Sequence, residues 1–168
     1  MKFTTAFLLI ACASPALAID RCLVGVWEAD GADLAHIMGS QMPSGSSVQH
    51  ISGRVSLEIT NDGTMTLLAE DYTILSTMPE MPGTAITIAG YSQGAMNADD
   101  GTNYVANAPE YSLIGSADVL GQRLEMSAAE LSGGAWGQST GTYGCSGNSV
   151  SFDANRLGSI PRRWRRIR

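Results

Sequence analysis

The stretch Arg21-Cys22-Leu23-Val24-Gly25-Val26-Trp27 combines the first cysteine of the expected mature protein, a Gly-x-Trp triplet and the start of the first predicted strand. Its expected partners lie at the other end of the chain, in Tyr143-Gly144-Cys145 and Arg163-Trp164-Arg165-Arg166. A chain whose first strand meets its last strands closes on itself. This stretch therefore predicts a closed sheet.

Residues 1–18 have the pattern of a cleavable export signal. Lys2 supplies a positive charge, residues 3–13 form an uncharged and mostly apolar run, and Ala16-Leu17-Ala18 has the small-x-small form of a cleavage site. The run is too short to span a bilayer as a helix, and no later segment is apolar enough. We expect cleavage after Ala18 and export of residues 19–168, as one domain, to the periplasm or the medium.

The cysteines help to decide between two interpretations of residues 1–18. Leu9-Ile10-Ala11-Cys12 resembles a lipobox, which would make the product an outer-membrane lipoprotein anchored at Cys12. Cleavage after Ala18 instead leaves Cys22 and Cys145, an even pair suited to an oxidising compartment. We predict that these two form a structural disulfide across the closing seam, rather than a metal or redox pair.

The charge distribution argues against nucleic acid as a partner. Sixteen acidic residues oppose ten basic ones, and loss of Lys2 leaves nine arginines and a net charge of −7. Five of these arginines lie at the C-terminus, at Arg162, Arg163, Arg165, Arg166 and Arg168. We interpret them as partly neutralising an acidic body.

Alternation of apolar and polar residues predicts an all-β protein. Asn61-Asp62-Gly63-Thr64 is a strong hairpin signal, and the spacing of Leu34, Ile37 and Met38 predicts one helix at 33–42, lying across an end of the barrel. Strands are expected at 22–28, 48–60, 65–76, 84–96, 103–106, 110–120, 123–127, 142–145, 149–152 and 162–166. We predict a single antiparallel up-and-down β-barrel of about eight to ten strands, with a β-sandwich as the alternative.

The triplet Gly25-Val26-Trp27 at the start of this meander resembles the lipocalin and fatty-acid-binding-protein (calycin) superfamily. In those proteins the tryptophan closes one end of the barrel, and an arginine near the last strand commonly packs across its ring. The resemblance implies that Trp27, Trp164 and Arg166 are ligand-binding or barrel-closing residues. Arg162, Trp164 and Arg166 also resemble an Arg-x-Tyr-x-Arg pattern that holds a carboxylate. The early helix departs from typical lipocalins, whose long helix comes late in the chain.

Catalysis is not expected. His36 and His50 are the only near-neutral bases, and the chain has neither a Gly-x-Ser-x-Gly motif nor a glycine-rich phosphate loop. Adjacent acidic residues point to opposite faces of a strand, so they do not form an acid–base couple. We therefore expect a protein that is not an enzyme and that uses no cofactor and no metal.

Binding is the remaining class of function. Met38, Met42, Met78 and Met81 fall in the predicted helix and a loop, and Trp136 lies in a glycine-rich segment. Such side chains provide an adaptable apolar surface, and we predict that they form a mouth or contact surface.

Three functional hypotheses follow. The first is a monomeric binding protein for a small apolar or amphipathic ligand such as an acyl chain. The second is an envelope module that binds another protein, such as a lysozyme or protease inhibitor. The third is a structural envelope protein with a filled core.

Overall fold

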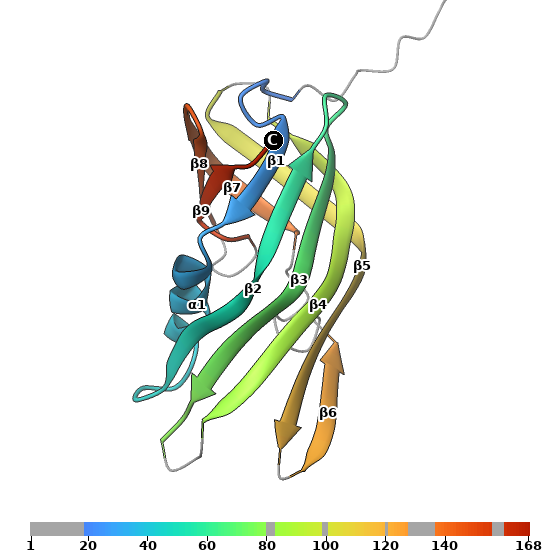
Figure 1. Cartoon of the computed structure of the whole chain (residues 1–168). Coiled ribbons are helices and arrows are strands. Elements are labelled where there is room, and N and C mark those ends of the chain that lie inside the picture. Colours follow the sequence, from blue (N-terminus) through green and yellow to red (C-terminus); the bar gives the residue numbers. More distant parts are fainter. Residues whose placement is uncertain (1–18, 80–82, 99–100, 120, 128–136, 156–159) are drawn as a thin grey trace, which may run out of the picture.

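The structure, a computed structural model, describes residues 19–79, 83–98, 101–119, 121–127, 137–155 and 160–168 (Figure 1). Its elements, in chain order, are β1 (Gly25–Ala29), α1 (Gly31–Ser40), β2 (Ser47–Ile59), β3 (Thr64–Thr77), β4 (Thr84–Asn97), β5 (Asn103–Val119), β6 (Gln122–Ser127), β7 (Ser139–Ser146), β8 (Ser149–Ala154) and β9 (Arg163–Arg166). All pairings between these strands are antiparallel.

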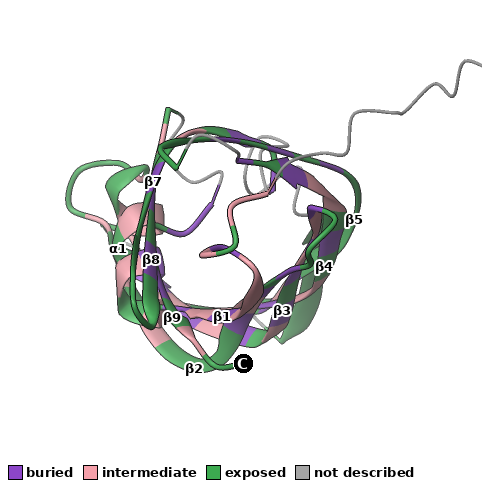
Figure 2. Ribbon diagram, turned by 90° about the horizontal axis from the view of Figure 1, so that it is seen from above, coloured by how far each residue is buried: buried purple, intermediate pink, exposed green. Residues whose placement is uncertain are grey.

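Eight strands close into a barrel, which confirms the predicted fold class. The order around the ring is β1, β2, β3, β4, β5, β7, β8 and β9, and β9 returns to β1 by pairing Trp27 with Arg166 and Ala29 with Trp164 (Figure 2). β6 lies outside this ring and pairs only with the end of β5 among the described strands. The first and last strands therefore meet as expected.

The strands differ in length, and this divides the barrel into two halves. β2, β3, β4 and β5 have 13, 14, 14 and 17 residues, whereas β1, β7, β8 and β9 have 5, 8, 6 and 4. The short strands complete the ring only at the top of Figure 1, which we call the upper half. Below it, β2–β5 continue as a tall wall, with β6 and α1 at its two sides. This is the lower half.

Buried side chains fill the core of the upper half. Its largest members come from almost every strand of the ring: Trp27, Leu57, Ile59, Met65, Leu67, Met96, Tyr104, Phe152 and Trp164. The rings of Tyr104 and Phe152 meet edge to face at 5.0 Å, and the hydroxyl groups of Tyr104 and Ser139 share a buried hydrogen bond of 2.6 Å. Close packing of this kind stabilises the closed end.

The wall bends where the lower half begins. Three neighbouring strands have a left-handed residue at about the same level: Gly53 (φ 75°), Asp71 (φ 48°) and Gly90 (φ 119°). The ladders between these strands change register near the same positions. Aligned irregularities of this kind curve a sheet, so the tall wall turns around the interior of the lower half.

The helix differs from the prediction in its bounds and its place. It begins at Gly31 because the Asp30 carboxylate accepts hydrogen bonds from the backbone N–H groups of Ala32 and Asp33, and it ends at Ser40. The sequence predicted the start at residue 33, whereas the Asp30 cap places it two residues earlier. α1 does not cross an end of the barrel; it lies along the flank, packed on β2 below the short strands (Figures 1 and 2).

β5 is one strand where two were expected. The ladder to β4 changes register between the pairs Ala95–Asn107 and Gln93–Glu110, and Pro109 lies within this irregularity. A proline is tolerated there because its missing N–H falls where the ladder is already disrupted. β1 is shorter than predicted, since Cys22 lies in a turn ahead of Gly25.

Candidate functional site

Two rows of mostly apolar residues cross the inner face of the lower half. Residues directly opposite each other on antiparallel strands share a face of the sheet. The strand registers therefore align residues from β3, β4, β5 and β6 in the rows Tyr72–Ile88–Gly115–Met126 and Ile74–Ile86–Ala117–Leu124. We call these the inner-face rows.

The inner-face rows become exposed where they reach β6. Tyr72 and Ile88 are buried, whereas Met126 is 38% exposed and Leu124 is 49% exposed. This exposure follows from the topology, because β6 extends past the ring and β7 does not continue beside it. The inner wall thus offers an accessible apolar surface at this side of the lower half.

Three of the predicted methionines lie in the lower half. Met42 approaches Ser76 near the end of β3, with Oγ and Sδ 3.9 Å apart, and Met38 packs against the core from α1. Met78 directly follows β3 and is half-buried. Met81 and Trp136 lie outside the described residues. The three described methionines thus occur at one end of the molecule, as a mouth requires; their contact with a ligand stays a prediction.

Tyr72 connects the inner-face rows to the helix. Its hydroxyl group donates a hydrogen bond of 2.8 Å to the carbonyl oxygen of Gly31, and its ring stacks on His50 at 5.0 Å. Burial is the main cause that raises the pKa of the Tyr72 phenol well above its ordinary value, and the nearby Asp30 charge acts in the same direction. The neutral phenol therefore anchors the start of α1 on the wall.

The opposite end of the barrel is closed by the residues of the predicted Gly-x-Trp contact. The guanidinium carbon of Arg166 lies 4.0 Å from the centroid of the Trp27 ring. The same guanidinium donates hydrogen bonds to the carbonyl oxygens of Val24 (2.6 Å) and Cys22 (2.8 Å). Arg166 is thus held by protein carbonyls and the indole face, without need of a ligand carboxylate.

Trp164 and the cysteines complete this closed end. Trp164 is buried, and its indole N–H donates to the carbonyl oxygen of Pro161 at 2.7 Å. The Sγ atoms of Cys22 and Cys145 lie 2.01 Å apart, the separation of a disulfide bond, which bears out the predicted pairing. This bond connects the turn before β1 to β7 and fixes the position of the carbonyl that Arg166 contacts.

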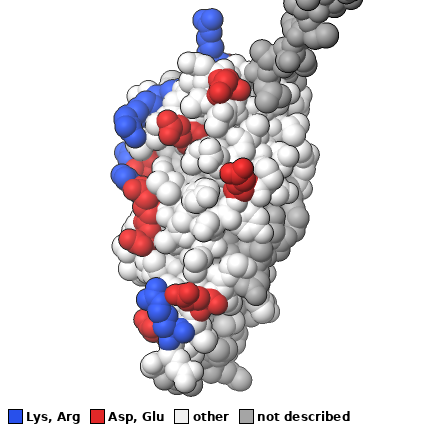
Figure 3. Space-filling model, turned by 90° about the vertical axis from the view of Figure 1, so that its right-hand side faces the viewer, with Lys and Arg blue, Asp and Glu red and all other residues white. Residues whose placement is uncertain are grey.

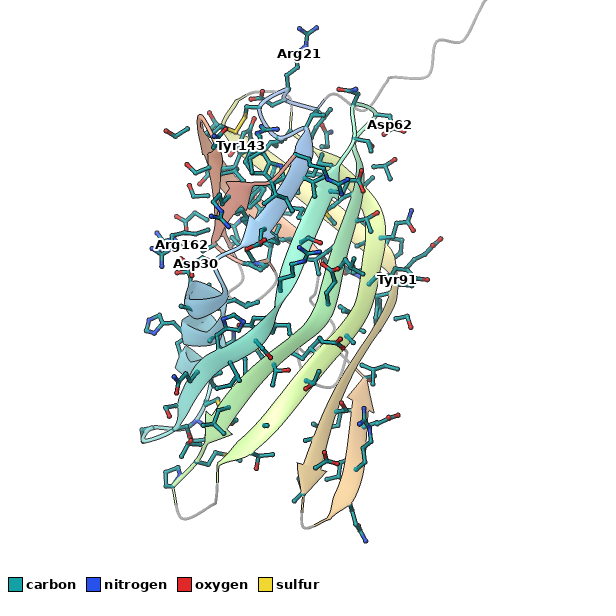
Figure 4. The ribbon with its side chains drawn as sticks, viewed as in Figure 1. Arg21, Asp30, Asp62, Tyr91, Tyr143 and Arg162 are labelled. Atoms are coloured by element: carbon teal, nitrogen blue, oxygen red, sulfur yellow. A yellow bond between two sulfur atoms is a disulfide. The ribbon has the colours of Figure 1, made fainter. Side chains whose placement is uncertain are left out.

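A polar groove lies on the outside of the barrel. It has a volume of about 700 Å³ and is lined by Asp33, Thr142, Tyr143, Gly144, Ser151, Phe152, Asp153, Arg162 and Arg163. Arg163 bridges to Asp33 at 3.0 Å and to Asp30 at 3.5 Å. Arg162 lines the same groove, and Figure 4 shows it on the side of the barrel where α1 begins. Of the five terminal arginines, Arg163 thus neutralises acidic residues at the helix N-terminus, and Arg165 lies 3.4 Å from Glu28 of β1.

The outer wall carries a second, smaller apolar feature. Leu68 of β3 and Tyr91 of β4 lie directly opposite each other and are partly exposed, and Tyr91 points away from the barrel (Figure 4). β4 contains no charged residue, and most of the face shown in Figure 3 is uncharged. A single cross-strand pair of this size is ordinary for a protein surface, so we assign it no role.

Sequence reasoning missed the exposed part of the inner-face rows. The alternation of Leu124 and Met126 was visible, but it predicts a strand with one apolar face and does not reveal that this strand lies outside the ring. Among the described residues, no group of three His, Cys, Asp or Glu side chains could hold a metal ion. No helix in the described ranges is long and apolar enough to cross a membrane.

Comparison of the chain with protein-family models, with curated proteins and with solved structures found no match. The protein is a closed antiparallel β-barrel with one filled, disulfide-linked end and one half whose apolar inner wall is accessible at β6.

Proposed function

We propose that the protein binds a small apolar or amphipathic molecule, such as an acyl chain, on the inner face of its lower half. The observation that carries the proposal is the exposure of the inner-face rows at Leu124 and Met126. Apolar surface gains roughly 25 cal/mol for each Å² removed from water, so an acyl chain lying along these rows is stabilised by burial alone.

The methionines support this choice of ligand class. Met38 and Met42 on α1 and the segment after it, and Met126 on β6, come from opposite sides of the lower half. Methionine is unbranched and polarizable, and it adapts to ligands of varied shape. This fits a site that accepts flexible chains rather than one rigid molecule.

The proposal includes a lipocalin-like character and export from the cytoplasm. The stacking of Arg166 on Trp27 is the contact expected from the resemblance, and it supports a place near the lipocalins and fatty-acid-binding proteins. The pairing of Cys22 with Cys145 supports an oxidising compartment. The predicted signal at residues 1–18 lies outside the described residues.

The outer groove favours a second candidate function, the binding of another protein. Its walls carry hydroxyl groups and charges of both signs, which is typical of the polar part of a protein–protein contact. Co-purification separates the two functions. Native mass spectrometry of the protein from its own host is expected to show a bound lipid if the first holds, and a protein partner if the second does.

A matched pair of variants tests the first function more directly. Leu124→Ser removes an exposed apolar side chain from the inner face, and Ile114→Ser removes one of similar exposure, 47%, from the outer face of the neighbouring strand. We expect Leu124→Ser to weaken binding of a fluorescent fatty acid by about tenfold and Ile114→Ser to leave it unchanged. The reason is that only Leu124 lies on the face that contacts the acyl chain in the proposed site. Equal effects of the two substitutions would contradict the proposed site.

A further inference from the structure

β6 is the edge of the sheet. Within the described residues it pairs with β5 on one side and with no strand on the other, and all six of its residues are exposed. An unpaired edge presents backbone N–H and C=O groups that can pair with another chain. Each of the other eight strands pairs with two strands over at least part of its length, so β6 is the exception among the described strands.

The phase of the β5–β6 ladder shows which backbone groups are available. Val119 and Gln122 are directly opposite, and only residues 120 and 121 separate them. The pair that flanks a two-residue connection is hydrogen-bonded, and such pairs alternate along the ladder. The N–H and C=O groups of Arg123 and Glu125 therefore point away from β5, toward the free edge.

The side chains at these two positions are complementary. Arg123 and Glu125 share the outer face, since the inner face holds Leu124 and Met126. They form an exposed ion pair of 3.3 Å within the strand, at 64% and 60% side-chain exposure. Antiparallel pairing of β6 with a second β6, centred on Leu124, sets Arg123 of each copy opposite Glu125 of the other.

Other two-fold registers are unfavourable. Centring the pair on Arg123 sets two arginines opposite each other, and centring it on Glu125 sets two glutamates opposite each other; like charges in such positions are destabilising. Shifting by a single residue sets inner-face side chains opposite outer-face ones and misaligns the free backbone groups. Among the registers that set a charged residue of one copy opposite a charged residue of the other, only the one centred on Leu124 pairs opposite charges and aligns the free backbone groups.

We propose that two copies of this chain associate through β6, in an antiparallel pairing that joins their sheets across a two-fold axis at Leu124. Each Arg123–Glu125 pair then exchanges two backbone hydrogen bonds and forms an ion pair across the axis. The two Leu124 side chains meet on the inner face, and the lower halves of both copies open to the same side. This departs from the expected monomer and does not depend on the proposed ligand.

Charge reversal tests the register. The measurement is sedimentation velocity of protein comprising residues 19–168, with its disulfide intact, from about 10 to about 500 µM, the range in which small interfaces associate. We expect the wild type to dimerise with rising concentration. Arg123→Glu or Glu125→Arg alone should weaken dimerisation at least tenfold, because each sets like charges opposite each other.

Two rescues complete the design. An equimolar mixture of the Arg123→Glu and Glu125→Arg proteins restores both cross-axis pairs, as does the double variant, so both should dimerise within about threefold of the wild type. Circular dichroism and the melting temperature of each variant show that the barrel is folded. A wild type that stays monomeric throughout, single variants that associate like it, or a mixture that stays monomeric each overturn the proposal.

The dimer proposal and the ligand-site proposal can be tested independently. Arg123→Glu changes the outer face only, so it should weaken dimerisation at least tenfold and leave fatty-acid binding intact. Leu124→Ser binding measured at protein concentrations below the dimerisation range reports on the ligand site alone.

Discussion

Arg166 is the residue on which the closed end depends most. Its guanidinium stacks on Trp27 and donates to two carbonyl groups in the segment before β1. Gly25 is part of the same arrangement, because a Cβ atom there would lie 2.4 Å from an Arg166 nitrogen atom. The Gly-x-Trp triplet is thus explained by local packing: the glycine makes room for the arginine that covers the tryptophan.

This role predicts unequal effects of removing two of the terminal arginines. Arg166→Ala should lower the free energy of unfolding by about 2–3 kcal/mol, because it removes two charge-assisted hydrogen bonds and a cation–π contact. Arg162 forms no ion pair with any described residue, so Arg162→Ala should change it by less than about 0.5 kcal/mol. Urea unfolding measures both, and equal losses would refute the structural role.

Tyr72 predicts a loss of stability in alkaline solution. Burial raises the pKa of its phenol in the folded state, while the unfolded chain ionises near about 10. The stabilising contribution is therefore fully present below pH 10 and is lost as the pH rises above it, since only the unfolded state then releases the proton. Burial also raises the pKa of Tyr104, which adds to the same loss.

The variant Tyr72→Phe isolates this contribution. At pH 9 it should cost about 1 kcal/mol through loss of the hydrogen bond to Gly31. Between pH 9 and pH 11 its free energy of unfolding should fall less steeply than that of the wild type. Urea unfolding at the two pH values measures these free energies. An equal decrease from pH 9 to pH 11 in the wild type and in Tyr72→Phe would show that Tyr72 is not buried as the structure has it.

At the scale of the elements, the bend in the wall depends on glycine. Gly90 has φ 119°, and a Cβ atom there would lie 1.8 Å from the carbonyl oxygen of Ser112 on β5. Gly90→Ala should therefore destabilise the protein by more than about 2 kcal/mol. Gly147 also has positive φ but has open space around it, so Gly147→Ala should cost only about 1 kcal/mol. Thermal unfolding of the two variants measures the difference. Similar melting temperatures would contradict the requirement for glycine at the bend of the wall.

The elements were largely predictable from the sequence, because period-two alternation and the turn at Asp62-Gly63 are local signals. The errors come from information that is not local. The helix begins at Gly31 and not at residue 33, because an aspartate before glycine suits a turn as well as a cap and so does not mark a helix start by itself. The continuation of β5 through Pro109 depends on a register change in the neighbouring strand. The position of β6 outside the ring depends on where β7 joins β5.

The candidate site was less predictable. The methionines pointed toward a mouth, but the exposure of Leu124 is a property of the assembled barrel and not of any stretch of sequence. The disulfide could be predicted, because the expected cleavage after Ala18 leaves an even pair of cysteines.

At the scale of the whole molecule, the disulfide connects residues 123 positions apart. Constraining so long a loop removes entropy from the unfolded chain and is worth up to roughly 4–5 kcal/mol in the chain-entropy model. The variant carrying both Cys22→Ser and Cys145→Ser should unfold at correspondingly lower urea concentration while retaining its β-sheet circular dichroism spectrum. A loss below about 1 kcal/mol would show that the pair does not constrain the closing seam.

The most direct test of the proposed function is methionine-methyl NMR during titration with a fatty acid. Met65 and Met96 are buried in the upper half, whereas Met42 and Met126 lie in the lower half and Met126 is on the inner face. Met65 and Met96 thus serve as internal controls in the same sample. We predict that the methyl signals of Met42 and Met126 shift on titration and that those of Met65 and Met96 stay in place. Shifts confined to Met65 and Met96, or no shift at any methionine up to millimolar fatty acid, would contradict binding in the lower half.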